Sequence, residues 1–296
     1  MHELKPVRVL YIMGTARSGS TILEILLSHG KGVFGAGELT ALVKDGLIDN
    51  KPCACGRSFQ ECEVWGRVGN GLNVPREEYR RWAWLQQRMD WHGGCVRSWL
   101  GLVRVSDHRN YERYNHELLH AIHRVTRSAV IVDSSKYACR ALAIHQIPGV
   151  ELRVICLTRS PQGLLASFRK LNKGEQRPKS APATVAYYGA VLLSLRIATW
   201  ILPRQDVYFL TYERLLSEPE NVLREIGQWS GIDLSVPIER LSKNGDFSVG
   251  HIVTGNRLRK RGRVRFDRTI NEPSTGNLAA RLMAGAMNGW RRLLGF

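Results

Sequence analysis

The sequence predicts an α/β fold with a mainly parallel sheet, helices on both faces and a helical insertion, in a single domain over residues 1–296. Three apolar, β-branched runs at 7–13, 129–133 and 151–158 are typical of buried parallel strands. The first and third runs lead into polar turns that are followed by apolar residues at helical spacing. With 44% apolar side chains in 296 residues, the chain has enough apolar surface for a sizeable core.

Residues 14–21, with the sequence GTARSGST, join the first strand to the first helix. A glycine turn between a strand and a helix points backbone N–H groups and the positive end of the helix dipole at an anion. Gly14 and Gly19 let the backbone close around an oxyanion without Cβ clashes. Ser20 stands where a nucleotide-binding P-loop has lysine, and the cation comes earlier, as Arg17. The turn therefore predicts an anion-binding loop in a P-loop-like fold; an ordinary β–turn–α corner is the alternative.

The loop G-T-A-R-S-G-S-T-I-L resembles the 5′-phosphosulfate loop of the sulfotransferases that use 3′-phosphoadenosine-5′-phosphosulfate (PAPS). The bacterial and Golgi branches, including the tyrosylprotein sulfotransferases, share its Arg-Ser-Gly core. A planar guanidinium in mid-loop suits a doubly anionic phosphosulfate. The resemblance implies that PAPS binds to five consecutive residues of this loop: Arg17, Ser18, Gly19, Ser20 and Thr21.

The second part of the family pattern follows the third strand, where Arg159 and Ser167 stand eight positions apart. This spacing resembles the family's 3′-phosphate site, in which the arginine binds the phosphate and the serine adds a hydroxyl. The run Y-E-R-L-L resembles the family's Y-E-x-L pattern and implies that Tyr212 faces the adenine. A tyrosine at the end of a strand is otherwise ordinary.

Two residues are candidates for the chemistry itself. Glu38 lies 21 residues beyond Arg17, between glycines and apolar residues, and a carboxylate beside a cleft can take a proton from an acceptor hydroxyl. The tyrosylprotein sulfotransferases have their general base at a similar separation, so the resemblance implies this role for Glu38. Lys136 follows a strand in D-S-S-K, and the resemblance implies that it and Arg17 neutralise the transferring group. Ala138 stands where cytosolic members have a catalytic histidine, which favours Glu38 as the base.

The net charge of +17 is compatible with nucleic acid, an anionic membrane surface or a polyanionic small ligand as partner, and also with a merely solvated basic surface; the sequence does not decide between them. Seven basic residues and one acid lie between Arg257 and Arg268, which is compatible with a nucleic-acid arm. The same segment loosely resembles the family segment that folds over the 3′-phosphate. That resemblance implies nucleotide contacts from Asn256 and Arg259.

Residues 40–128 depart from strand–helix alternation and form the predicted helical insertion. Five of the eight tryptophans lie here: Trp65, Trp82, Trp84, Trp91 and Trp99. Aromatic surface beside polar groups suits a sugar, an aryl group or a lipid chain, so we interpret the insertion as the acceptor-recognition region. A small helical subdomain with tryptophans in its core is an equally good interpretation.

The cysteines predict no metal site. Cys53, Cys55 and Cys62 cluster, but no fourth ligand stands at the usual spacing, so the order of interpretation is structural loop, then disulfide, then metal. A disulfide is disfavoured in a reducing cytosol. Cys139 and Cys156 lie in apolar surroundings and are expected to be core thiols.

The predicted activity is sulfuryl transfer from PAPS to a hydroxyl of a glycan, a glycolipid, a tyrosine or a secondary metabolite, leaving 3′-phosphoadenosine-5′-phosphate (PAP). The alternatives are a nucleoside or small-molecule kinase and a non-catalytic nucleic-acid-binding protein. No apolar run approaches the ~20 residues of a membrane span and no signal peptide is evident, so a cytoplasmic location is expected. The last amphipathic stretch is expected to pack on the core, with peripheral membrane contact as the minor alternative.

Overall fold

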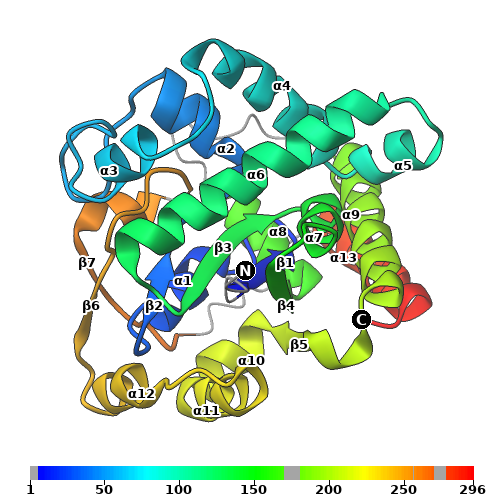
Figure 1. Cartoon of the computed structure of the whole chain (residues 1–296). Coiled ribbons are helices and arrows are strands. Elements are labelled where there is room, and N and C mark those ends of the chain that lie inside the picture. The colour runs from blue at the N-terminus through cyan, green and yellow to red at the C-terminus, as the bar shows by residue number, and fades with distance from the viewer. Residues whose placement is uncertain (1–5, 170–180, 256, 270–277) are drawn as a thin grey trace.

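The structure is a computed structural model that describes residues 6–169, 181–255, 257–269 and 278–296 (Figure 1). Five parallel strands form the central sheet in the order β2-β3-β1-β4-β5. Their bounds are β1 Val7–Gly14, β2 Val33–Gly35, β3 Val130–Lys136, β4 Val150–Thr158 and β5 Val207–Thr211. A separate antiparallel pair joins β6 (Asp246–Ser248) to β7 (Arg263–Arg265). The predicted α/β fold with a mainly parallel sheet is confirmed.

Helices cover both faces of the sheet, as the alternation along β1 requires. Tyr11 and Met13 belong to one core, and Leu10 and Ile12 belong to the other. The first core is completed by α6 (Val105–Thr126), α7 (Ala138–His145), α9 (Ala181–Ile201) and α13 (Leu278–Leu294). The second is completed by α1 (Ser20–Leu27), α11 (Pro219–Ser230) and α12 (Ser235–Ser242).

The chain between β2 and β3 is helical, as predicted for residues 40–128. Before α6 it forms α2 (Leu39–Leu42), a π-helical turn (Val43–Ile48), α3 (Trp65–Asn70), a 3₁₀ turn (Arg76–Glu78), α4 (Tyr79–Met89) and α5 (Gly94–Trp99). The last helix of the segment, α6, packs on β1 and β3 and so belongs to the cover of the sheet. Trp65 and Trp82 are fully buried core residues, whereas Trp84 and Trp91 are exposed. Trp65 and Trp82 thus agree with a helical subdomain that has tryptophans in its core, and acceptor recognition by the exposed tryptophans stays a prediction.

The remaining helices follow β4 and β5. They are α8 (Pro161–Arg169), a 3₁₀ turn (Arg204–Asp206), α10 (Tyr212–Ser217) and a second 3₁₀ turn (Arg257–Arg261). The final helix, α13, packs against α8 and α9, in agreement with its expected place on the core.

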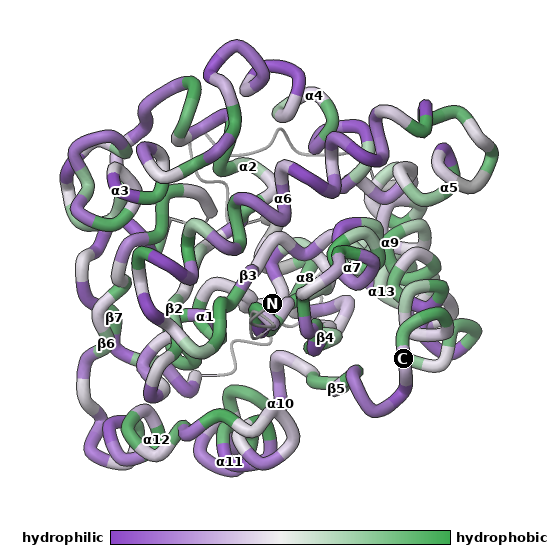
Figure 2. The backbone as a smooth tube through the Cα atoms, in the orientation of Figure 1, coloured by the Kyte–Doolittle hydropathy of each residue, from purple (hydrophilic) through white to green (hydrophobic). Residues whose placement is uncertain are grey.

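One helix within the described residues, α9, is long and apolar enough to cross a membrane by length and composition, with a mean hydropathy of 1.3 over Pro182–Ile201. The expectation that no apolar run approaches this length is wrong by that measure. The tube in Figure 2 is accordingly mostly green and white along α9. Buried residues make up 39% of the span, and the helix packs against β1, α7 and α13. In this fold α9 is therefore one of the helices that cover the sheet.

Candidate functional site

The glycine turn lies at the carboxyl end of β1, the central strand. A Cβ at Gly14 would lie 2.0 Å from the carbonyl oxygen of Leu157 on β4, so only glycine fits there. Gly19 has a φ of +90°, and its Cβ would lie 2.3 Å from the ring of Tyr212. Gly19 is also the N-cap of α1, where no side chain makes a capping hydrogen bond. The first N–H groups of α1 thus remain available for an anion.

The two halves of the predicted nucleotide site meet in space. Arg17 Nε donates a hydrogen bond of 3.0 Å to Ser167 Oγ, and Arg159 Nη1 donates one of 2.9 Å to the carbonyl oxygen of Arg17. The Arg159 guanidinium lies 4.3 Å from the centre of the Tyr212 ring, a cation–π contact. Arg17, Ser167, Arg159 and Tyr212 therefore form one cluster at the carboxyl ends of neighbouring parallel strands. Their roles toward a ligand stay predictions.

Three buried polar atoms of the glycine turn and of Arg159 have no hydrogen-bond partner among the described residues: Thr15 Oγ1, Ser18 Oγ and Arg159 Nε. Ser18 is fully buried and Thr15 is 2% exposed. Buried polar atoms are normally paired, so unpaired ones at a glycine turn point to a missing ligand. Burial lowers the pKa of Arg159, and a bound anion would stabilise its charged guanidinium. The residues present thus fit a ligand with several anionic groups.

Glu38 and Lys136 form an ion pair beside this cluster. Lys136 Nζ donates to Glu38 Oε1, and the side chains remain 19% and 23% exposed, respectively. Glu38 follows β2 and Lys136 ends β3, so both lie at the carboxyl edge of the sheet. Lys136 and Arg17 have positive φ values of 75° and 67°. Such strain at non-glycine residues is concentrated at functional sites, and here it occurs at both predicted catalytic cations.

A buried carboxyl that the sequence analysis missed supports the Glu38 loop. Glu24 on α1 accepts hydrogen bonds from the backbone N–H of Gly37 and from Ser134 Oγ, the latter at 2.7 Å. Burial raises the pKa of Glu24 to about 8. The sequence did contain a signal for this group, because Glu24 is the one acidic residue in the apolar stretch ILEILL. A carboxyl on the buried face of a helix needs hydrogen-bond donors around it.

A second missed group is a fully buried ion network. Arg140 donates to Asp133 Oδ2 at 2.9 Å and to Asp90 Oδ2 at 3.2 Å, and all three side chains are 0% exposed. Thr40 Oγ1 donates to the same Asp90 oxygen at 2.6 Å, and the Thr40 N–H donates to Ser135 Oγ at 3.0 Å. Through Thr40, the network therefore joins the segment that follows Glu38 to Ser135, the residue before Lys136.

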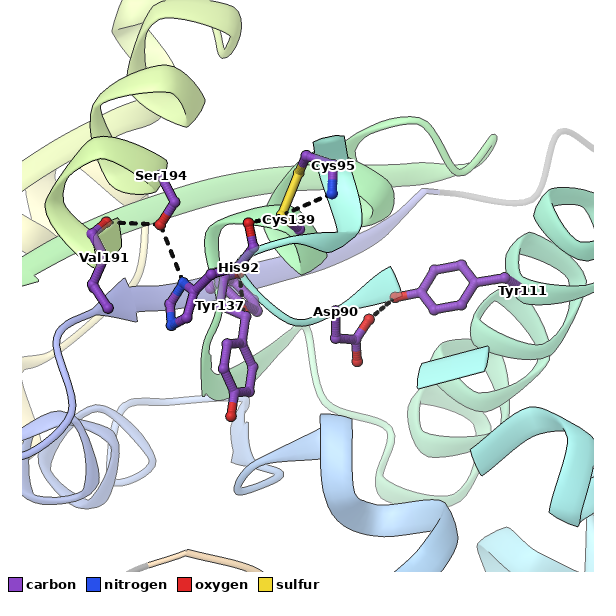
Figure 3. Close-up of a disulfide and its surroundings, with 9 residues drawn as sticks. Asp90, His92, Cys95, Tyr111, Tyr137, Cys139, Val191 and Ser194 are labelled. Atoms are coloured by element: carbon purple, nitrogen blue, oxygen red, sulfur yellow. Dashed lines mark hydrogen bonds between the residues drawn. A yellow bond between two sulfur atoms is a disulfide. The ribbon is translucent and has the colours of Figure 1, made fainter. Parts of the chain in front are cut away.

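Aromatic residues lie next to the ion pair. Trp91 stacks on Tyr137, with ring centres 6.0 Å apart and planes at 16°, and His92 meets Tyr137 edge-on at 5.2 Å. Figure 3 shows Tyr137 and His92 side by side, with Asp90 nearby. Burial, and after it the charges of Tyr187 and Glu38, raise the pKa of Tyr137.

A disulfide borders this aromatic group. Cys139 is bonded to Cys95, so the expectation that Cys139 is a free core thiol is wrong (Figure 3). The bond links α7 to α5. Cys156 is a buried free thiol, as expected.

An open pocket of about 190 Å³ lies elsewhere in the insertion. Its lining includes Leu47, Phe59, Trp65, Tyr79 and Arg80. None of the residues predicted to act in catalysis lines it, so the ion pair and not this pocket defines the candidate site.

The two predicted nucleotide contacts near the carboxyl terminus stay predictions. Asn256 lies outside the described residues. Arg259 Nη1 donates to the carbonyl oxygen of Pro52 at 3.0 Å, beside the cysteine loop. The loop itself has a fourth neighbour that the sequence analysis missed, because His251 lies against its sulfurs. No local spacing signals a residue that comes almost 200 positions later.

The fold is similar to that of a solved structure, the sulfotransferase domain from the curacin biosynthetic pathway. The two agree with a TM-score of 0.52 at 15% identity, over 96% of this chain and 99% of that one. The fold is that of the sulfotransferases. A sulfotransferase from Mycobacterium tuberculosis is similar at a TM-score of 0.48 and 15% identity, over 83% of this chain and 73% of that one. No family model and no curated protein matches the sequence.

Proposed function

We propose that this chain is a sulfotransferase that transfers a sulfuryl group from PAPS to a hydroxyl of an acceptor. The observation that carries the proposal is the contact between the glycine turn and the Arg159–Ser167 pair, through the two hydrogen bonds of Arg17. A nucleotide with anionic groups at both ends of its ribose needs cations from both segments in one place. A β–turn–α corner without a ligand does not need cations from two distant segments in one place.

The residues divide by the part of PAPS that each would hold. The turn, from Arg17 to Thr21, would bind the 5′-phosphosulfate through its guanidinium, its hydroxyls and the N–H groups of α1. Arg159 and Ser167 would bind the 3′-phosphate, and Tyr212 would face the adenine. Asn256 and Arg259 are further proposed contacts. PAPS supplies the activated sulfuryl group, and no metal is proposed at this site because arginine and lysine supply the countercharge.

Glu38 is proposed as the general base. Its Oε1 accepts from Lys136, so Oε2 is the atom that would take the proton of the acceptor hydroxyl. In the overall reaction the acceptor oxygen gains the sulfuryl group, its proton goes to Glu38, and the phosphate oxygen of PAP keeps the bonding electron pair. Lys136 and Arg17 would stabilise the negative charge as it develops on the leaving oxygen.

The acceptor would lie against the aromatic residues of the insertion. Trp91 is 57% exposed and stacks on Tyr137, which directly follows Lys136 in the chain. Such a surface suits a ring or a chain that carries the reacting hydroxyl, as in a glycan, a glycolipid, a tyrosine or a secondary metabolite. We therefore keep residues 40–128 as the proposed acceptor-recognition region.

Calorimetric titration with PAP and with Mg-ATP tests the donor. We expect tighter binding of PAP, because Ser20 replaces the lysine that kinases place on the β- and γ-phosphates. Tighter binding of Mg-ATP would favour a kinase. Salt-dependent DNA or RNA affinity that survives Arg159→Ala would favour a nucleic-acid-binding protein. Labelled PAPS with acceptor pools, and Glu38→Ala as the blank, then tests the transfer itself.

A further inference from the structure

Three cysteines and one histidine gather at the base of the insertion. The ligand atoms of Cys53, Cys55, Cys62 and His251 all lie within 4.8 Å of one another. Three of these residues come from one short loop, and His251 follows β6, 189 positions after Cys62. Chance rarely brings four soft ligand atoms together from two distant segments.

The distances match a tetrahedral site. Cys53 Sγ and Cys62 Sγ are 3.7 Å apart, and His251 Nδ1 lies 3.2 Å from Cys62 Sγ and 3.9 Å from Cys53 Sγ. With Zn–S of about 2.3 Å and Zn–N of about 2.0 Å, tetrahedral coordination separates two sulfurs by about 3.8 Å and a sulfur from a nitrogen by about 3.5 Å. The Cys53, Cys62 and His251 atoms thus already have the spacing of a coordination shell, and Cys55 Sγ lies within 4.8 Å of each of them.

Backbone hydrogen bonds hold both segments that supply the cluster, the cysteine loop and the segment of His251. The Cys53 N–H donates to the Arg57 carbonyl at 2.8 Å, and the Gly56 N–H donates back to the Cys53 carbonyl at 3.0 Å. Gly56 has a φ of +89°, which closes this tight turn. The Ala54 N–H donates to the Ile252 carbonyl at 2.9 Å, so the cysteine turn and the histidine segment are joined directly.

His251 is oriented as a metal ligand would be. Its Nδ1 faces the sulfurs, and its Nε2 lies 3.6 Å from Glu63 Oε1. Trp65 Nε1 donates to the His251 carbonyl oxygen, which fixes the backbone. Metal-binding histidines typically present their second nitrogen to a carboxylate, which sets the tautomer.

We infer that Cys53, Cys55, Cys62 and His251 bind a zinc ion. Sulfur and imidazole ligands in a tetrahedron select zinc over the oxygen-preferring magnesium and calcium. Four protein ligands leave no open position, so the site is structural. On binding, the three thiols lose their protons to solvent, and three thiolates with Zn²⁺ leave one negative charge.

The position of the site suggests what the metal does for the fold. Thr254, three residues after His251, donates from Oγ1 to the backbone carbonyl of Glu38 at 2.8 Å. Ile252 and Val253 between them are buried. Zinc would therefore tie the loop of the insertion to the segment that supports Glu38. The inference rests on the cluster alone and does not depend on sulfuryl transfer.

Metal analysis of the wild-type chain is the direct test. The protein is purified without a histidine tag or chelator and under reducing conditions, and its zinc is measured by plasma mass spectrometry. We expect one zinc ion per chain, and after exchange with Co²⁺ the visible bands of tetrahedral cobalt with thiolate charge transfer. A folded chain that holds no zinc and gives no such cobalt spectrum would overturn the inference. A Cys53–Cys62 disulfide found by mass mapping under the same conditions would also overturn it.

Variants locate the ion. Cys55→Ser and His251→Ala should each lower zinc affinity at least tenfold, and Glu63→Gln should lower it about tenfold through the histidine. Cys156→Ala, which removes a free thiol outside the cluster, is the matched control and should keep its zinc. If a ligand variant fails to fold, wild-type melting with and without a zinc chelator decides: a fall in Tm is expected. An unchanged Tm, or a His251→Ala variant with wild-type zinc affinity, would contradict the inference.

Discussion

Lys136 donates a hydrogen bond to Glu38 although the two residues are 98 positions apart. They meet because β2 and β3 are adjacent and parallel, so the chain leaves both strands at the same edge of the sheet. The pair holds the proposed base and one of the two proposed cations side by side, next to the glycine turn at the end of β1.

Replacing Glu38 should separate binding from chemistry. Glu38→Gln removes the proton acceptor and keeps the shape, so turnover should fall by about 10²- to 10⁴-fold while PAP affinity stays the same. Initial rates with labelled PAPS and calorimetric PAP titrations measure the two quantities. Glu112→Gln, at an exposed position of α6, is the control and should leave both unchanged. Normal turnover in Glu38→Gln would remove Glu38 from the mechanism.

Arg159 should act on one phosphate only. Arg159→Ala removes a charge-assisted hydrogen bond worth about 1.5–3 kcal/mol, so PAP affinity should fall about 10- to 100-fold. Adenosine 5′-phosphosulfate, which lacks the 3′-phosphate, should bind wild type and variant alike. Arg113→Ala, an exposed arginine on α6, is the control. Equal losses for both nucleotides would place Arg159 elsewhere in the site.

The two exposed tryptophans of α4 and the segment after it provide a matched pair. Trp91 stacks on Tyr137 near Glu38, whereas Trp84 contacts Arg88. Trp91→Ala should raise the acceptor KM up to about tenfold, because an aromatic stack is worth about 0.5–1.5 kcal/mol, and should leave PAP affinity unchanged. Trp84→Ala should change neither. Steady-state kinetics with the identified acceptor measures the acceptor KM of both variants. Equal changes of KM in Trp91→Ala and Trp84→Ala would show that the surface around Trp91 does not recognise the acceptor.

Glu24 should make the stability depend on pH. Its pKa is raised from 4.5 to about 8 in the folded chain, so the folded state binds the proton more tightly than the unfolded state. The stabilisation is fully present below pH 4.5 and is lost as the pH rises to about 8. Since one pKa unit corresponds to about 1.4 kcal/mol, the loss can reach about 5 kcal/mol.

Glu24→Gln lacks this titration, and its amide can still serve Gly37 and Ser134. Urea unfolding at pH 5.5 and pH 9 should therefore show the variant gaining stability over wild type as the pH rises. Glu112→Gln should follow wild type at both values. A wild-type stability that does not fall over this range would show that Glu24 is ionised in the folded chain.

Arg140 should be needed for folding stability. Arg140→Met leaves Asp90 and Asp133 buried without a countercharge, and breaking a buried pair in this way costs about 3–5 kcal/mol. Arg113→Met breaks an exposed pair with Glu78 and should cost less than about 1 kcal/mol. Denaturant unfolding of both variants compares them, and similar losses would refute the distinction.

The sequence by itself determined the elements whose signals are local. The β-branched runs became β1, β3 and β4, because a strand buried on both faces needs an apolar residue at nearly every position. The glycine turn lies at the end of β1, where Gly14 and Gly19 have no room for a side chain. Arg17, Arg159 and Ser167 were singled out because two short segments resemble a family pattern, and the sheet order then brought them into contact.

Only the tertiary structure decided the contacts between segments that are far apart in the chain. His251 joins Cys62 across 189 positions, Cys139 joins Cys95 across 44, and Glu24 meets Ser134 across 110. No periodicity within a window of a dozen residues carries such a pairing, because the packing of whole elements sets it. The sequence contained each ligand, thiol and carboxyl; the stacking of helices on the sheet selected their partners.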